Sequence, residues 1–232
     1  MIDKRLLACA DYVREQARFC DIGTDHAYLP CYLVKHQRVI SAIAADIHQN
    51  PLKSAQHTIE SMGLVGKIQL IQSDGLQQIP PEQADDIVIA GMGGELIAQI
   101  IEACSWVKDE KKRLILQPMT QLSFLRKRLY QLGYQILEET PVFENQHHYT
   151  VLLCQYTGQC KQIDELYSIV GEIPRNNTRE AIAFLRYQQK RKQKIVDGLK
   201  KSSQQQHNIQ HYEFLVQQIQ ALIIKQKENQ RE

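Results

Sequence analysis

Long apolar segments and paired cysteines are missing from this sequence of 232 residues. Because no run of about 18 consecutive apolar residues occurs, we expect no membrane-spanning helix. The first residues carry charges without a long apolar stretch behind them, so no secretory signal peptide is expected. The 6 cysteines are scattered without a C-x-x-C pair, and several lie in apolar runs. This usage argues against a disulfide scaffold or a zinc site and favours a reducing, cytoplasmic location.

Net charge is also small, but the charges are unevenly distributed. The formal net charge is +2, and residues 1–160 are slightly acidic whereas residues 161–232 are basic. A basic C-terminal segment indicates a polyanionic partner such as a nucleic acid. A solvated helix face rich in lysine explains the same composition equally well.

Apolar runs of strand character alternate with helical patterns through the first two thirds of the chain. The apolar spacing over residues 2–17 predicts a first helix. Two late strand-like runs, 134–142 and 149–156, flank a polar loop at 143–148, which predicts an antiparallel hairpin. The earlier strands are expected at about 19–23, 40–46, 68–72, 86–90 and 114–117. Because these strands are continuously apolar and alternate with helices, they predict an α/β fold with a mostly parallel sheet covered on both faces.

The C-terminal segment has helical patterns and no strand-like run. Spacings of three and four residues form a heptad seam at Ile209, Tyr212, Val216, Ile219 and Ile223. An earlier helix is marked by Ile182, Leu185, Ile195 and Leu199. Its exposed face carries the basic residues Arg186, Lys190, Arg191, Lys192 and Lys194. A break at 201–203 would let the two helices pair antiparallel. We therefore expect a domain at 1–160, a basic coiled-coil-like domain at 161–232, and a monomer.

Acids and glycines recur where the predicted parallel strands end. Because these ends lie side by side at one edge of a parallel sheet, they predict a ligand site there. A carboxylate at the end of the second strand, Asp46, is placed to accept hydrogen bonds from a ribose diol. Asp74 could accept from an adenine amino group, with Gly75 letting the ring approach. The predicted cofactor-binding set is Asp21, Gly23, Asp46, Asp74, Gly75, Gly91, Met92 and Gly93.

The turn after the first strand lacks the second and third glycines of the dinucleotide fingerprint G-x-G-x-x-G. Its sequence is Gly23-Thr24-Asp25-His26-Ala27-Tyr28. Asp25 stands where a pyrophosphate would come, and two like charges held that close repel each other. The acid instead suits a cationic ligand such as S-adenosylmethionine, which favours a methyltransferase over a dehydrogenase.

A family resemblance rests on motifs in the same stretch and in later strands. Residues 21–30 (DIGTDHAYLP) resemble the first motif of the bacterial TrmK family. Later motifs of that family are matched by 87–94 (IVIAGMGG), 114–118 (LILQP) and 132–134 (LGY). The resemblance implies a class I, Rossmann-like methyltransferase that methylates N1 of adenine 22 in tRNA. The chain departs from the family pattern at Met119 and at residues 147–149 (HHY).

Catalysis of this kind would consist mainly of positioning, because adenine N1 has an in-plane lone pair and needs no prior deprotonation. With the base flipped out, we expect Asp25, His26 and Tyr28 to line the methyl pocket. Two alternatives remain open: a methyltransferase for another substrate, and an inactive RNA-binding protein of the same fold. His207 and His211 have a spacing that could bind a metal, but without a third ligand we expect no metal site.

Overall fold

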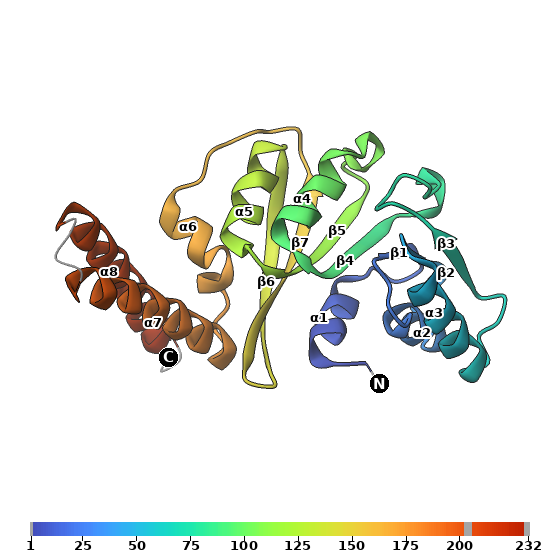
Figure 1. Ribbon diagram of the computed structural model, residues 1–232, viewed down its shortest axis with the longest axis horizontal. Coiled ribbons are helices and arrows are strands. Elements are labelled where there is room, and N and C mark those ends of the chain that lie inside the picture. The colour runs from blue at the N-terminus through green and yellow to red at the C-terminus, as the bar shows by residue number, and fades with distance from the viewer. Residues whose placement is uncertain (1, 202–205, 230–232) are drawn as a thin grey trace. The chain divides into compact units, whose positions relative to one another are not determined.

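The computed structural model describes residues 2–201 and 206–229 and divides into two compact units, Met1–Gln162 and Ile163–Glu232. The first unit is built on a 7-stranded sheet with the order β3-β2-β1-β4-β5-β7-β6 (Figure 1). Strands β1 to β5 run parallel, and β7 is antiparallel to both β5 and β6. The strands are β1 Ala17–Ile22, β2 Val39–Asp46, β3 Ile68–Gln72, β4 Asp86–Gly93, β5 Arg113–Thr120, β6 Tyr134–Glu144 and β7 His147–Tyr156. The predicted α/β class with its terminal antiparallel hairpin is confirmed.

Helices cover both faces of this sheet because its strands carry apolar side chains on both faces. One core cluster joins α1, α2 and α3 to strand residues such as Phe19, Val88 and Ile115. Helices α4 and α5 pack against each other and bury Ile97 and Leu129 outside that cluster. The helices are α1 Lys4–Tyr12, α2 Tyr28–Lys35, α3 Gln49–Ser61, α4 Gly94–Glu102 and α5 Leu122–Gln131, with short 3-10 turns at Pro81–Gln83 and Ser105–Val107.

The first helix is shorter than residues 2–17, which the apolar spacing predicts. It begins after Asp3, whose Oδ1 accepts a hydrogen bond from the Leu6 amide at 2.7 Å. It ends because Val13 has an extended backbone, with φ −72° and ψ 126°. Ala17 then begins β1, so a strand occupies the end of the range predicted as helix.

Two parallel strands run further than the sequence predicts. β4 continues through Gly91–Gly93, and its register with β5 shifts between Ala90 and Met92. β5 continues through Pro118, although a proline cannot donate to a strand ladder. Pro118 is tolerated because it pairs with Met92 at this irregularity and because β7 pairs with β5 only as far as Leu116.

The hairpin of β6 and β7 closes with a two-residue turn instead of the predicted polar loop at 143–148. Asn145 and Gln146 both have positive φ, 49° and 65°, as the tight turns that join twisted strands require. Phe143 and His148 therefore form a cross-strand pair with ring centroids 4.8 Å apart.

A buried ion pair joins α5 to the sheet. Arg126 of α5 makes two hydrogen bonds to Glu139 of β6, at 2.7 and 3.0 Å, and both side chains are fully buried.

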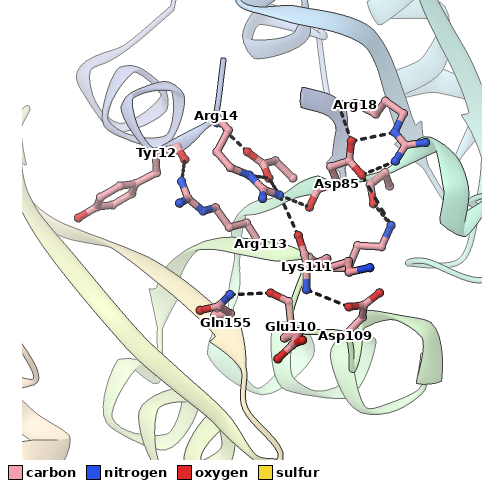
Figure 2. A network of polar contacts seen from close by, with 12 residues as sticks. Tyr12, Arg14, Arg18, Asp85, Asp109, Glu110, Lys111, Arg113 and Gln155 are labelled. Atoms are coloured by element: carbon pink, nitrogen blue, oxygen red, sulfur yellow. Dashed lines mark hydrogen bonds and ion pairs between the residues drawn. The ribbon is translucent and has the colours of Figure 1, made fainter. Parts of the chain in front are cut away.

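Ion pairs tie together the amino-terminal ends of β1, β4 and β5 (Figure 2). Asp86 is fully buried and accepts from the Arg14 amide at 2.7 Å and from Arg14 Nε at 2.8 Å. Arg18 donates to both carboxylate oxygens of Asp85, at 2.8 and 2.7 Å. This edge is thus occupied by its own polar contacts, and the cavity described below lies at the opposite edge.

The second unit contains α6 Glu165–Val170, a 3-10 turn at Ile173–Arg175, and the long helices α7 Arg179–Lys201 and α8 Gln206–Asn229. The long helices are antiparallel, since Gln189 bonds Gln220 at 2.8 Å and Lys200 pairs with Glu213 at 2.6 Å. Among the apolar residues that mark α7 in the sequence, Ile195 is 38% exposed, and the neighbouring Val196 is buried instead. The predicted break at Ser202-Ser203 lies outside the described residues.

Neither a metal cluster nor a membrane span is found in the described part of the chain. The side chain of His207 lies outside the described residues, and His211 Nε2 lies 2.7 Å from Glu165 Oε2. Among the residues that the structure covers, no group of three or more His, Cys, Asp or Glu side chains could hold a metal ion. None of the described helices is long and apolar enough to cross a membrane.

Candidate active site

A cavity of about 380 Å³ lies at the carboxyl ends of β1 and β4. Between these neighbouring strands the order of the sheet reverses, which is where open α/β sheets bind ligands. Its walls come from the start of α1, the β1–α2 loop and the end of β4. The lining residues are Asp3, Arg5, Leu6, Asp21, 23–29, Ala90 and Gly91.

The β1–α2 loop is held against β2 by its backbone. The amides of Gly23 and Thr24 both donate to the Ala45 carbonyl, at 2.8 and 2.9 Å. Gly23 has φ +77°, and a Cβ there would lie 2.0 Å from Met92 Cε. Glycine is favoured at position 23 by this left-handed backbone conformation, and the end of the Met92 side chain occupies the space that its missing Cβ leaves.

Asp21 is a buried acid at the floor of this cavity, 8% exposed. Burial raises the pKa of its carboxyl to about 6, against a smaller lowering by the Thr24 hydroxyl and the Arg5 charge, and Asp46 raises it further. A cationic ligand beside Asp21 would favour the ionised carboxylate, because an opposite charge offsets the cost of burial. This acid is thus suited to receive a positive group.

Asp25, His26 and Tyr28, which we expect to line the methyl pocket, lie together at the cavity. The rings of His26 and Tyr28 are stacked, with centroids 5.2 Å apart and planes 24° apart. His26 Nε2 lies 3.4 Å from Asp25 Oδ2, and the Asp25 side chain is 77% exposed. Tyr28 is 36% exposed. The arrangement offers a half-exposed aromatic surface with an acid at its margin.

Asp46, Asp74 and Gly75 do not line the cavity. Asp46 ends β2 beside it, and its Oδ1 accepts from the His48 amide at 2.8 Å. Asp74 is exposed and accepts from Gln77 at 3.4 Å. A Cβ on Gly75 would lie 2.9 Å from Ile100 Cγ2 of α4. On the side where a side chain would project, the space beside Gly75 is therefore filled by Ile100.

Only part of the glycine-rich end of β4 lines the cavity. Gly91 lines the cavity and has φ +80°. Met92 packs against Gly23, and a Cβ on Gly93 would lie 3.3 Å from Thr120 Oγ1. Met92 and Gly93 thus contact the neighbouring loop and strand β5 and do not line the cavity.

Sequence reasoning missed Asp3, Arg5 and Gln117. Arg5 donates to Gln117 Oε1 at 2.6 Å and pairs with Asp3 at 3.2 Å. Gln117 is fully buried and also accepts from the Gly91 amide at 3.1 Å. A polar residue at the end of the apolar run 114–116 was a visible signal for Gln117, because buried polar groups need partners. Nothing local to Arg5 marks it as a site residue.

Comparison with known proteins places this geometry in a family. A family described as "Methyltransferase domain" matches residues 2–152. The crystal structure of the Bacillus subtilis M1A22 tRNA methyltransferase TrmK is 32% identical, with a TM-score of 0.78, and the match covers 97% of this chain and 98% of that one. This chain belongs to the TrmK family of methyltransferases. The assignment confirms the resemblance of the sequence motifs.

Other TrmK relatives have related descriptions. A Streptococcus pneumoniae protein, "a putative tRNA (m1A22) methyltransferase, in complex with S-adenosyl-L-methionine", is 31% identical with a TM-score of 0.81, over 96% of this chain and 100% of that one. A curated tRNA (adenine(22)-N(1))-methyltransferase of Bacillus subtilis is 42% identical over 154 residues. That alignment covers 66% of this chain and 65% of the relative, so the chain spans just under two thirds of this relative's length.

The positions at which the chain departs from the TrmK pattern lie at the edge of the sheet formed by the carboxyl ends of the parallel strands. Met119 is 49% exposed at the end of β5, and its sulfur lies 3.7 Å from Gln117 Nε2. His147 and His148 lie at the start of β7 rather than in a loop. Burial lowers the pKa of His148, which favours its neutral form.

The cavity's charges fit a cationic donor better than a phosphate. Carboxyl groups of Asp3, Asp21 and Asp25 line it, together with the Arg5 guanidinium. Arg5 is already bound by Asp3 and Gln117. An acidic lining attracts a sulfonium and an ammonium and repels a pyrophosphate. The donor set therefore fits S-adenosylmethionine.

In the second unit, the basic residues expected on an exposed helix face, which we expect to contact tRNA phosphates, lie along α7. Arg186, Lys190, Arg191 and Lys194 are exposed and fall within about 140° of the helix circumference at 100° per residue. Lys192 points elsewhere, with its Nζ 5.5 Å from the centre of the Tyr212 ring of α8. Lys192 thus contributes to the pairing of α7 and α8.

Proposed function

We propose that this chain transfers a methyl group from S-adenosylmethionine to N1 of adenine 22 in tRNA. The observation that carries the proposal is the buried Asp21, which faces an acidic cavity at the sheet's switch point in a chain of the TrmK family. The donor, when bound, supplies an electrophilic methyl group on a sulfonium. The residues of the chain have to bind that cation and hold the acceptor base against it.

Donor binding is assigned to the edge formed by β1, β2 and β3. Asp21 and the Gly23 turn would hold the cationic amino-acid end, because they line the cavity. Asp46, at the adjoining strand end, would accept from the ribose hydroxyl groups. Asp74 would accept from the adenine amino group, and Gly75 shapes the turn through its φ of +56°. The ends of the neighbouring strands thus hold successive parts of one extended ligand.

The acceptor base is assigned to the other side of the cavity. The stacked rings of His26 and Tyr28 offer an aromatic face, on which flipped-out bases commonly stack. Asp25 would balance the positive charge that the adenine gains on N1 methylation. The backbone of Gly91 to Gly93 lies beside or behind this place. Since N1 needs no deprotonation, these groups would act by positioning and by charge.

The basic face of α7 is assigned to the tRNA backbone. Its exposed guanidinium and ammonium groups suit phosphates, which supply affinity and salt dependence but little sequence information. This assignment gives the second unit a role in tRNA binding and leaves donor binding to the first unit. The working state is proposed to be a monomer in the cytoplasm, where tRNA is modified.

Nucleoside analysis of tRNA tests the proposal. An unmodified tRNA transcript is incubated with the protein and S-adenosylmethionine, digested, and examined for 1-methyladenosine. A transcript with guanine at position 22 is the matched control and should stay unmodified. Methylation of another nucleoside would indicate a different substrate. Tight tRNA binding without methyl transfer would indicate an inactive RNA-binding protein instead.

A further inference from the structure

Gln117 has a fixed orientation at the end of β5, and this orientation connects two distant parts of the chain. Its Oε1 accepts from Arg5 Nη1 at 2.6 Å and from the Gly91 amide at 3.1 Å. Its Nε2 donates to the Pro118 carbonyl at 2.9 Å. Exchanging the amide oxygen and nitrogen would set an NH₂ group against two donors, so the observed orientation is favoured. Because Gln117 is fully buried, water does not compete for these bonds.

Arg5 is itself held at the start of α1. Its Nη2 lies 3.2 Å from Asp3 Oδ2, while Asp3 Oδ1 caps the helix through the Leu6 amide at 2.7 Å. The Arg5 side chain is only 18% exposed. The planar guanidinium therefore joins the helix cap to the interior of the sheet edge, which a single-point donor cannot do in the same way.

Gly91 lies at the far end of this connection and lines the cavity. Its φ of +80° falls at the irregular register between β4 and β5. A Cβ added there would find only Arg5 Nη1, at 3.7 Å, within 4 Å. The Gly91 amide donates to Gln117 Oε1 at 3.1 Å, and this bond lies between the β4–β5 pairs at Ala90 and Met92, where the register shifts.

We propose that Arg5 is a positioning residue, which acts through Gln117 to fix the Gly91 backbone and so to place the acceptor base against the methyl donor. The structural half of this proposal is that Arg5 and Gln117 fix the Gly91 backbone, and it does not depend on the proposed function. The catalytic half is that this backbone helps to place the acceptor base, and it rests on the proposed function. Reactions catalysed by positioning are sensitive to small displacements, and a shift of about 1 Å can cost about 100-fold in rate. Arg5 would thus affect the rate without contacting the reacting atoms.

Hydrogen exchange at the Gly91 amide, measured by NMR on the full chain without donor or tRNA, tests the structural half. We expect Arg5→Ala and Gln117→Leu to speed exchange at Gly91 by about tenfold or more, because the amide loses a fixed acceptor. Arg5→Lys should keep part of the protection. Lys4→Ala removes the same charge from an exposed neighbour on α1 and should change nothing. Unchanged exchange at Gly91 in Arg5→Ala would overturn the proposal.

Kinetics test the catalytic half. For Arg5→Ala we expect kcat to fall by about 10- to 100-fold, while KM for tRNA and the Kd for S-adenosylmethionine change by less than about threefold. The double variant Arg5→Ala/Gln117→Leu should lose no more than Gln117→Leu alone, because both act on one connection. If the losses in kcat of the two single variants multiply in the double variant, the catalytic half is refuted. It is also refuted if Arg5→Ala changes only KM. If the wild type does not methylate tRNA, the proposed function fails, and the exchange measurement still decides the structural half.

Discussion

The Asp21 carboxyl lines the cavity and has a raised pKa. Burial is the main cause of its raised pKa of about 6, compared with 3.8 for an ordinary aspartate. The folded chain therefore keeps this proton to a higher pH than the unfolded chain does. Between pH 3.8 and about 6 the folded state binds more protons, so stability falls as the pH rises through this window.

The size of this effect follows from the two pKa values. Their separation corresponds to about 3 kcal/mol of free energy of unfolding, lost in full above pH 6. Asp21→Asn cannot ionise, so it does not show this loss. We expect the stability of the variant relative to the wild type to increase by about 3 kcal/mol from the acid end of the window to pH 7.

Trp106 provides the assay, because it is the sequence's one tryptophan and lies in the same unit as Asp21. Urea unfolding followed by its fluorescence, at about pH 4, 5, 6 and 7, gives the free energy of unfolding of both proteins. Asp25→Asn is the matched control, because its side chain is 77% exposed and its charge is solvated. A stability difference between wild type and Asp21→Asn that does not change with pH would refute the reasoning.

The same charge governs binding of the proposed donor. A cationic ligand prefers the ionised carboxylate, so the affinity of the wild type should fall by about tenfold for each pH unit below 6. Asp21→Asn should bind more weakly above pH 6 and show no such slope. Calorimetric titration with S-adenosylmethionine measures both, and a parallel slope in the two proteins would assign the pH dependence to another group.

Further predictions concern the neighbouring strand end, the basic helix and the buried ion pair. Asp46→Ala should weaken S-adenosylmethionine binding by about 10- to 100-fold in calorimetry, because a charged acceptor for the ribose is lost. Lys190→Ala/Lys194→Ala should reduce the slope of log affinity for tRNA against log salt by about 1 to 2, measured by filter binding. Arg126→Met should lower the free energy of unfolding by about 3–5 kcal/mol in urea titrations, since it removes the bidentate partner of Glu139.

Each of these three predictions has a control or an outcome that would contradict it. For Asp46→Ala, an unchanged thermal midpoint together with wild-type affinity would exclude Asp46 from the donor site. Lys67→Ala, at the amino-terminal end of β3, should leave the salt slope unchanged, and equal effects would contradict the role of α7. For the ion pair, Arg126→Met/Glu139→Leu should recover most of the loss, because no buried charge is then left without its partner.

Much of the fold and part of the site could be predicted from local patterns. Apolar strands alternating with helices determine a parallel sheet, and parallel strands bring Asp21, Asp46 and Asp74 to one edge. The turn from Gly23 to Tyr28 could likewise be recognised, because its missing glycines and its acid are visible in the sequence. The ends of β4 and β5 were less predictable. The two strands stay paired through Gly91–Gly93 and Pro118, which are residues that usually end a strand.

The class of fold and the acidic turn after the first strand could thus be predicted from sequence alone, since both depend on periodicity and on residues close together in the chain. Tertiary structure alone decided which residues line the cavity. Arg5 and Gln117 are 112 positions apart and meet only when α1 packs against the end of β5. Likewise, Ile100 of α4 comes close to Gly75 only through the packing of the helix, 25 positions further along the chain. Contacts of this kind depend on how separate elements pack, and no local pattern encodes that.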